Sequence, residues 1–131
     1  WVSVARFFSG SGFWRVQSAF ANYINTTYTY ELDFSLVYGH CEVVFSTYNG
    51  AGSGGGLLKF IVASHSGNNT TTQLIEVGRT NYGNNTIGSP YKSGGQVRWQ
   101  VTVANSGNNG SATCALFGMT DGTYFPFVKQ I

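Results

Sequence analysis

Apolar and polar residues alternate with a period of two in the most strongly patterned parts of this sequence. Between residues 28 and 36, from Tyr28 to Leu36, every apolar side chain falls on one side and every polar one on the other. This is the pattern of a half-buried antiparallel strand. It recurs over residues 97–103, where Arg98, Gln100 and Thr102 are expected to face away from the core.

Two further segments, 42–46 and 58–62, are more continuously apolar and predict strands that are covered on both faces. Weaker strand candidates cover residues 1–7, 14–21, 73–78, 112–117 and 125–130. No segment repeats apolar residues with the helical period over ten or more residues, and no internal repeat is evident.

Segments rich in Gly, Asn and Ser separate the strands, and such segments form turns. They occupy residues 9–12, 49–56, 66–70, 81–88 and 105–110. Short strands with turns at even spacing predict an all-β fold, an antiparallel β-sandwich of jelly-roll type, with residues 1–131 as one domain. The long loops at 49–56 and 81–93 are the expected places for recognition.

The surface of this fold must stay hydrated through neutral groups. Charged residues supply only 9% of the chain, against about 25% in a typical soluble domain. The net charge of +2 is too small and too scattered for nucleic-acid binding. No apolar run approaches the ~18 residues of a membrane span, so we expect no membrane insertion. No signal peptide is present, and the start at Trp1 without Met predicts a fragment of a longer protein. Such a composition suits a protein that acts outside a cell or on a virus particle.

The candidates for catalysis are few. Glu31 and Asp33 share one face of a strand about 6.5–7 Å apart, a separation that a glycosidase pair uses. They lie opposite the expected core side, so a solvated or interface face is the simpler explanation. Neighbouring residues of a strand point to opposite faces, so His40 does not activate Cys41. His65 has no partner at metal-ligand spacing. We therefore expect no enzyme, no metal and no cofactor.

Cys41 and Cys114 each lie in an apolar stretch. A disulfide between them would close a long loop and could stabilise the fold by about 4 kcal/mol. The alternative is two buried thiols that pack as small hydrophobic side chains.

Sugar binding is the strongest candidate for recognition. Aromatic rings can cover the apolar side of a pyranose, while neutral amides and hydroxyls bind its hydroxyl groups. Residues 81–86 and 89–92 contain both kinds of side chain, and the start of the Gly-rich segment offers a second, smaller set. The candidate ligand-binding residues are Tyr82, Asn84, Asn85, Tyr91, Lys92, Tyr48 and Asn49. The alternative is that these loop aromatics anchor their own loops.

Aromatic residues are more numerous than one small core requires, with three Trp, eight Tyr and ten Phe. The apparent surplus is Tyr23, Tyr28, Tyr30, Phe117, Tyr124, Phe125 and Phe127. Large exposed apolar patches are rare on monomers, and subunit interfaces favour aromatic residues. The surplus therefore predicts a homo-oligomer.

Three segments resemble the C-terminal receptor-binding domains of bacteriophage tail fibres: Trp1 to Arg6, the Gly-rich segment before Leu57 to Val62, and Val97 to Asn105. The resemblance implies a homotrimeric β-sandwich at the fibre tip of the virion that contacts a host cell-surface glycan or protein receptor. It also implies assembly without disulfides, hence free thiols at Cys41 and Cys114. In several such fibres a following chaperone segment is cut off, which an end at Ile131 would fit.

The sequence leaves three possible functions open. The first is a non-enzymatic attachment module that holds a host receptor by many weak contacts, since linked sites raise avidity. The second is a small glycan-cleaving domain that uses Glu31 and Asp33, with Glu42 as a further carboxylate. The third is a structural or signalling trimeric jelly roll of the capsid, tumour-necrosis-factor or complement type.

Overall fold

The computed structural model of the chain describes residues 2–7, 12–22, 26–34, 39–64, 72–104, 109–120 and 126–131. Within these ranges the chain forms eleven strands and one 3₁₀ turn. The strands are β1 (Val2–Phe7), β2 (Gly12–Asn22), β3 (Thr26–Asp33), β4 (Gly39–Asn49), β5 (Gly54–Ser64), β6 (Gln73–Gly83), β7 (Asn85–Ile87), β8 (Tyr91–Ser93), β9 (Gln96–Val103), β10 (Asn109–Thr120) and β11 (Phe127–Gln130). The 3₁₀ turn η1 (Gly50–Gly52) joins β4 to β5. No helix in the described ranges is long and apolar enough to cross a membrane.

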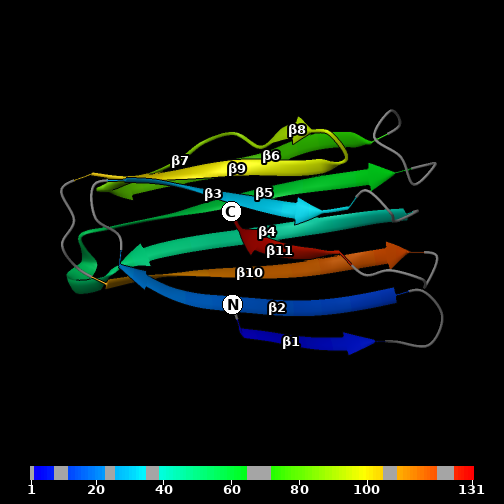
Figure 1. The fold of residues 1–131 in the computed structure, drawn as a ribbon, viewed down its shortest axis with the longest axis horizontal. Coiled ribbons are helices and arrows are strands. Elements are labelled where there is room, and N and C mark those ends of the chain that lie inside the picture. Colours follow the sequence, from blue (N-terminus) through cyan, green and yellow to red (C-terminus); the bar gives the residue numbers. More distant parts are fainter. Residues whose placement is uncertain are drawn as a thin grey trace.

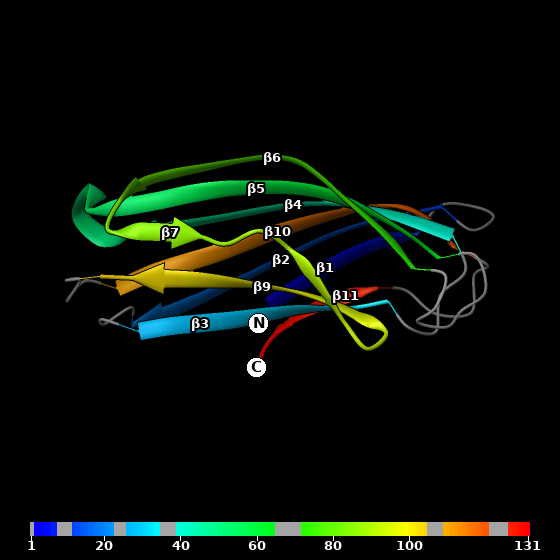
Figure 2. The same cartoon turned by 90° about the horizontal axis from the view of Figure 1, so that it is seen from above.

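The strands form two antiparallel sheets that pack face to face (Figures 1 and 2). The six-stranded sheet has the order β1-β2-β10-β4-β5-β6. The five-stranded sheet has the order β11-β3-β9-β7, with β8 also paired to β9. The antiparallel β-sandwich that the alternation predicts is confirmed.

One pair of connections has a jelly-roll character. The chain crosses from the six-stranded to the five-stranded sheet between β2 and β3, and it crosses in the reverse direction between β9 and β10. Because β2 pairs with β10 and β3 pairs with β9, these two connections join strands that are neighbours in both sheets. In contrast, β4, β5 and β6 form a simple meander within one sheet.

An aromatic cluster occupies the centre of the core. Trp99 of β9 packs edge-on against Phe45 and Phe60, with ring centroids 5.2 Å away in both cases. Tyr30 of β3 stacks on Trp99 at 6.1 Å and lies 4.8 Å from Phe45. All four side chains are fully buried, and such ring pairs add about 0.5–1.5 kcal/mol each beyond their buried area.

Tyr30 was expected among the surplus aromatics, and this placement is wrong because its strand directs it into the core. Tyr28 is partly buried and packs against the same core. Phe117 and Phe127 remain exposed, at 38% and 39%. The other residues expected in the surplus, namely Tyr23, Tyr124 and Phe125, lie outside the described residues.

The strands β4 and β5 are covered on one face only, which corrects the expectation of two covered faces. Burial alternates along both strands. Val44 and Ile61 on the outer face are half-buried, and Leu57 is 43% exposed. The reason is that a two-layer sandwich leaves the outer face of each sheet without a second layer.

Much of the two segments expected to be long loops is strand. After η1, β5 begins at Gly54, and residues 81–93 contain the end of β6 and all of β7 and β8. Gly56 shows why glycine is used inside a strand here. A Cβ at this position would lie 2.7 Å from the Cδ1 of Ile87, so the close approach of β7 requires a residue without a side chain.

Side-chain hydrogen bonds join the two sheets along one edge of the sandwich, between β2 and β11. The Gln17 amide donates a hydrogen bond from Nε2 to the Val128 carbonyl oxygen and accepts one at Oε1 from the Val128 N–H, both at 2.8 Å. Arg15 adds a bond from Nη1 to the carbonyl oxygen of Pro126 at 3.0 Å. Gln17 and Val128 are both buried, so this one amide satisfies two backbone groups that water does not reach.

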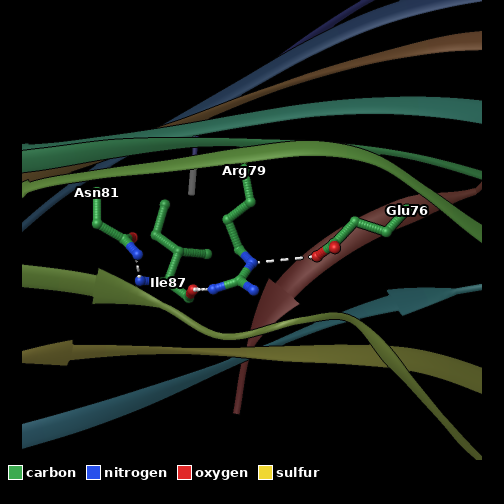
Figure 3. A network of polar contacts seen from close by, with 4 residues as sticks. All are labelled: Glu76, Arg79, Asn81 and Ile87. Carbon is green, nitrogen blue, oxygen red and sulfur yellow. Dashed lines mark hydrogen bonds and ion pairs between the residues drawn. The ribbon is translucent and has the colours of Figure 1, made fainter.

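The opposite edge is closed in the same way between β6 and β7 (Figure 3). The Ile87 N–H donates to Oδ1 of Asn81 at 2.7 Å, and the Ile87 carbonyl oxygen accepts from Nη1 of Arg79 at 2.8 Å. Glu76 holds the guanidinium through its Oε1 atom, 3.1 Å from Nε of Arg79. Thus the N–H and the carbonyl oxygen of Ile87, like those of Val128, are both bonded by side chains of the other sheet.

We expect Gln17→Ala to lower the free energy of unfolding by about 2–4 kcal/mol, because it leaves two buried backbone groups of Val128 without partners. Urea unfolding followed by fluorescence measures this loss. Gln73→Ala, at an exposed position of β6, is the matched control and should change stability by less than about 0.5 kcal/mol. An equal loss in the two variants would contradict the role given to the Gln17 amide.

Candidate functional site

Two exposed tyrosines lie in line on the outer face of the six-stranded sheet. In the strand register Tyr48 of β4 is opposite Gly55 of β5, and Gly55 is opposite Tyr82 of β6. Residues in register on neighbouring strands share a face, so both rings stand on the same side with a glycine between them. Their exposed fractions are 55% for Tyr48 and 68% for Tyr82. The end of β4, the start of β5 and the end of β6 lie together beside η1, at the left of Figure 1.

A buried polar network fixes the backbone on either side of Tyr48. Its neighbours Thr47 and Asn49 point inward and are buried. Asn49 donates from Nδ2 to Oδ1 of Asn85 at 2.7 Å, and Asn85 donates from Nδ2 to Oγ1 of Thr47 at 2.9 Å. Asn85 belongs to β7 of the other sheet, so Tyr48 is held between two residues that are anchored across the sandwich.

Tyr82 is positioned by the neighbouring residue Asn81. The Asn81 side chain points inward to the Ile87 backbone (Figure 3), which directs the next side chain, Tyr82, outward. The following residue, Gly83, has φ +59, and a Cβ there would come within 2.2 Å of the Ser53 carbonyl oxygen. Glycine is therefore required for the tight connection from β6 to β7.

The structure separates the sequence-predicted ligand-binding residues into three pairs and a single residue, Asn84. Tyr48 and Tyr82 come together on the outer face, and Asn49 and Asn85 bond each other beneath them. Asn84 is half-buried, and its backbone bridges Ser53 and Ala104 with hydrogen bonds of 3.0 Å each.

The third pair consists of Tyr91 and Lys92 in β8 of the five-stranded sheet. Tyr91 is 43% exposed. Lys92 donates from Nζ to the carbonyl oxygen of Thr72 at 3.0 Å. The structure therefore does not place these two residues beside Tyr82, although they are close in sequence.

Neutral hydroxyl groups lie along one side of the tyrosine pair. One row further along the sheet, Thr113, Ser46, Leu57 and Thr80 are in register on the same face. The sequence analysis missed the contributions of Ser46, Thr80 and Gly55, although the alternation within each strand places them on this face. The charged side chains described on this face are Glu42 and Lys59, which pair at 2.7 Å further along the strands from the tyrosines. The surface around the tyrosines therefore combines hydroxyl groups with the exposed apolar side chain of Leu57 and is close to neutral in charge.

A shallow hollow of about 230 Å³ lies at one end of the five-stranded sheet and is lined by residues 26, 27 and 102–104. The hydroxyl oxygens of Thr27 and Thr102 are 3.2 Å apart on this side. The hollow offers hydroxyl groups and short side chains, whereas the tyrosine pair offers ring faces.

Glu31 is buried between two cations on the outer face of the five-stranded sheet. Its Oε2 lies 2.8 Å from Nε of Arg98, and its Oε1 lies 3.3 Å from Nζ of Lys129. Burial acts to raise the pKa of Glu31, but the hydrogen bonds and charges of Arg98 and Lys129 outweigh it and hold the pKa below its ordinary value. The carboxylate is ionised, which does not suit the proton donor of a glycosidase pair. Asp33 shares this face and is half-buried.

Both cysteines are free and fully buried, so the expectation of free thiols is confirmed. Burial raises the pKa of Cys41 and of Cys114 well above the ordinary value, which keeps them protonated and unreactive. His40 is exposed on the face opposite Cys41. The described ranges contain no group of three or more His, Cys, Asp or Glu side chains that could hold a metal ion.

Fold and surface together define an antiparallel β-sandwich with a neutral, aromatic outer face. No protein-family model and no curated protein sequence matches the chain. Among solved structures, it is similar to a tailspike protein from the Acinetobacter baumannii bacteriophage Fri1, a capsular polysaccharide depolymerase. The two share 14% sequence identity with a TM-score of 0.58, and the match covers 98% of this chain. It covers only 21% of the tailspike chain. At this identity the likeness establishes the fold alone.

The comparison corrects one expectation from the sequence, namely that the chain is not an enzyme. A solved structure with a similar fold belongs to a capsular polysaccharide depolymerase. The absence of a catalytic motif in the sequence was therefore insufficient grounds for a non-enzymatic assignment.

The ion pairs of Glu31 make stability depend on pH in a defined direction. A carboxylate whose pKa is lower in the folded state stabilises the fold above its unfolded pKa, about 4.3 for Glu, and this contribution is lost as the pH falls through the folded-state pKa. Glu31→Gln should flatten the dependence of unfolding free energy on pH between about 6 and 3.

The measurement is urea unfolding at several pH values in this range. Glu42→Gln removes a carboxylate from an exposed pair on the other sheet, which contributes little to stability, so it should leave the profile nearly unchanged. Identical profiles for the wild-type chain and Glu31→Gln would show that the ion pairs do not set the acid sensitivity.

Proposed function

We propose that this chain is a glycan-binding domain of a bacteriophage tail protein and that it attaches the virion to the surface polysaccharide of a host bacterium. The observation that carries the proposal is the outer face with Tyr48 and Tyr82, where exposed rings and hydroxyl groups meet with no unpaired charge described nearby. Such a combination suits the apolar faces and hydroxyl groups of sugars.

The shared fold supports this proposal. The tailspike with the similar fold is a capsular polysaccharide depolymerase, so the fold occurs in a phage protein that acts on a bacterial surface glycan. We propose that residues 1–131 act as one domain of a longer fibre or spike protein at the outer end of the phage tail. Binding by this domain is compatible with cleavage by the complete protein.

We also propose that the domain is a homotrimer. The end of the outer face away from the tyrosines carries an apolar group beside the paired Glu42: Trp14 and Phe117 lie with their ring centroids 6.2 Å apart, and Met119 is 51% exposed. Apolar residues of this kind favour contact with other copies of the chain. Three linked sites would raise the avidity for a repeating polysaccharide by about 10²–10⁴ over that of one site.

Adsorption to host cells tests the attachment role. Fluorescently labelled chain should bind encapsulated cells of the host and lose binding when the capsule is removed. Because the surface holds few charges, affinity should change less than about threefold between 50 mM and 500 mM salt. A hundredfold fall over this range would contradict the neutral mode of binding.

Sedimentation velocity tests the trimer. We expect a trimer at micromolar concentration and a shift towards monomer for Phe117→Lys combined with Met119→Lys, since two buried charges oppose assembly. Phe127→Lys is the control, because Phe127 is exposed to a similar degree on the five-stranded sheet. A stable monomer of the wild-type chain would refute the proposed trimer.

A further inference from the structure

We infer that Tyr48, Gly55 and Tyr82 form a platform that binds an extended, neutral polysaccharide lying across the strands. Each tyrosine ring covers one sugar, and Gly55 lies beneath the sugar between them. The inference rests on the proposed glycan-binding function and adds the site, the direction of the chain and the class of sugar.

The spacing of the strands determines the spacing of the rings. Tyr48 and Tyr82 are two strands apart, with Gly55 between them in direct register. Neighbouring strands are about 4.8 Å apart, so the two positions are separated by about 9.6 Å. This separation is comparable to the length of two sugar units in an extended chain. The rings therefore match alternate sugars of one polysaccharide that runs perpendicular to the strands.

Glycine at position 55 keeps the floor between the rings open. A Cβ at this position would stand on the same face, 3.7 Å from the Cβ of Tyr48 and 2.8 Å from the Thr47 carbonyl oxygen. Any larger residue would fill the space between the tyrosines. With glycine there, the backbone itself forms the floor, and a sugar between the two rings meets no side chain.

Hydroxyl groups lie beside this line of three residues. Ser46 and Thr80 occupy the next row on β4 and β6, and Leu57 lies between them. Thr80 is exposed and Ser46 is half-buried. This row can bind hydroxyl groups along one edge of the polysaccharide, while the rings cover its apolar face.

Both tyrosines are anchored through the same short strand. Thr47 and Asn49, which flank Tyr48, are joined to Asn85 of β7. Asn81, which precedes Tyr82, bonds the backbone of Ile87 in the same strand (Figure 3). The two ring positions are therefore fixed relative to each other before any ligand binds, which lowers the entropic cost of binding.

Charge favours a neutral glycan over an acidic one or a nucleic acid. The described charges on this face are Glu42 and Lys59, which neutralise each other at 2.7 Å, and Glu42 lies six residues along β4 from Tyr48, opposite Phe117. Arg79, although in β6, reaches inward to Ile87 and Glu76 and does not face the platform. A second copy of the chain is a less suitable occupant of the platform, because the packed rings of Trp14 and Phe117 lie at the other end of this face.

The test measures affinity against chain length with neutral linear oligosaccharides of one to six units, from the cellulose, chitin and amylose series, by titration calorimetry. The intact chain should gain affinity sharply from two to three units, the length at which both rings are covered. Tyr48→Ala and Tyr82→Ala should each weaken binding of the longer oligosaccharides about fivefold to tenfold and abolish this gain. Tyr48→Phe and Tyr82→Phe, which keep the rings, should retain most of the affinity.

Tyr91→Ala is the matched control, since it removes an exposed tyrosine from the other sheet. It should bind like the wild-type chain. The same variants are measured for adsorption to encapsulated host cells, so that a host polysaccharide outside the three series is also covered. Circular dichroism and sedimentation on every variant separate lost binding from lost folding or assembly.

The possible results distinguish this inference from the function on which it rests. If the wild-type chain binds cells or oligosaccharides and the two alanine variants bind equally well, the platform is refuted and the glycan-binding function stands. Loss of binding in Tyr91→Ala alone would move the site to β8 and would also refute the platform. Tyrosine variants that change assembly and leave binding intact would identify a contact between copies. A wild-type chain that binds neither probe refutes both proposals.

Discussion

Side chains that bond the backbone of the opposite sheet hold this sandwich together at both open edges. Gln17 satisfies the N–H and C=O of Val128 at one edge, and Asn81 with Arg79 does the same for Ile87 at the other. A sandwich leaves such edge groups without a neighbouring strand, and buried backbone groups without partners are costly. Amide and guanidinium groups thus do at the edges what strand pairing does within each sheet.

The hydrogen bonds at the edges also determine which side chains face outward. The core is built around Trp99, which contacts rings from both sheets. On β4 and β6 the inward residues bond β7, and the alternate residues, Tyr48 and Tyr82, consequently face outward. The arrangement of the exposed tyrosines is therefore a consequence of the contacts that join the two layers.

The charged groups of the protein are used mainly for structure. Glu31 is enclosed by Arg98 and Lys129, and Arg79 bonds both Glu76 and a backbone carbonyl oxygen. The outer face of the six-stranded sheet around Tyr48 and Tyr82 is neutral and carries aromatic rings and hydroxyl groups. Its fold is shared with part of a phage tailspike that degrades capsular polysaccharide, and this likeness supports a glycan as the ligand of that face. The ionised state of Glu31 directs any search for a catalytic proton donor to other residues.

By itself, the sequence determined the antiparallel strands, the buried face of the clearly alternating strands such as β3 and β9, and the neutral character of the surface. These properties follow from local alternation and composition, which act over a few residues. Only the tertiary structure decided which strands became neighbours and in which register. It placed Tyr48 and Tyr82 in one row with Gly55 between them, and it separated Tyr82 from Tyr91. It also placed Asn49 and Asn85 in the interior. Register depends on contacts between residues far apart in the chain, and a shift by one residue would turn every side chain of a strand to the other face.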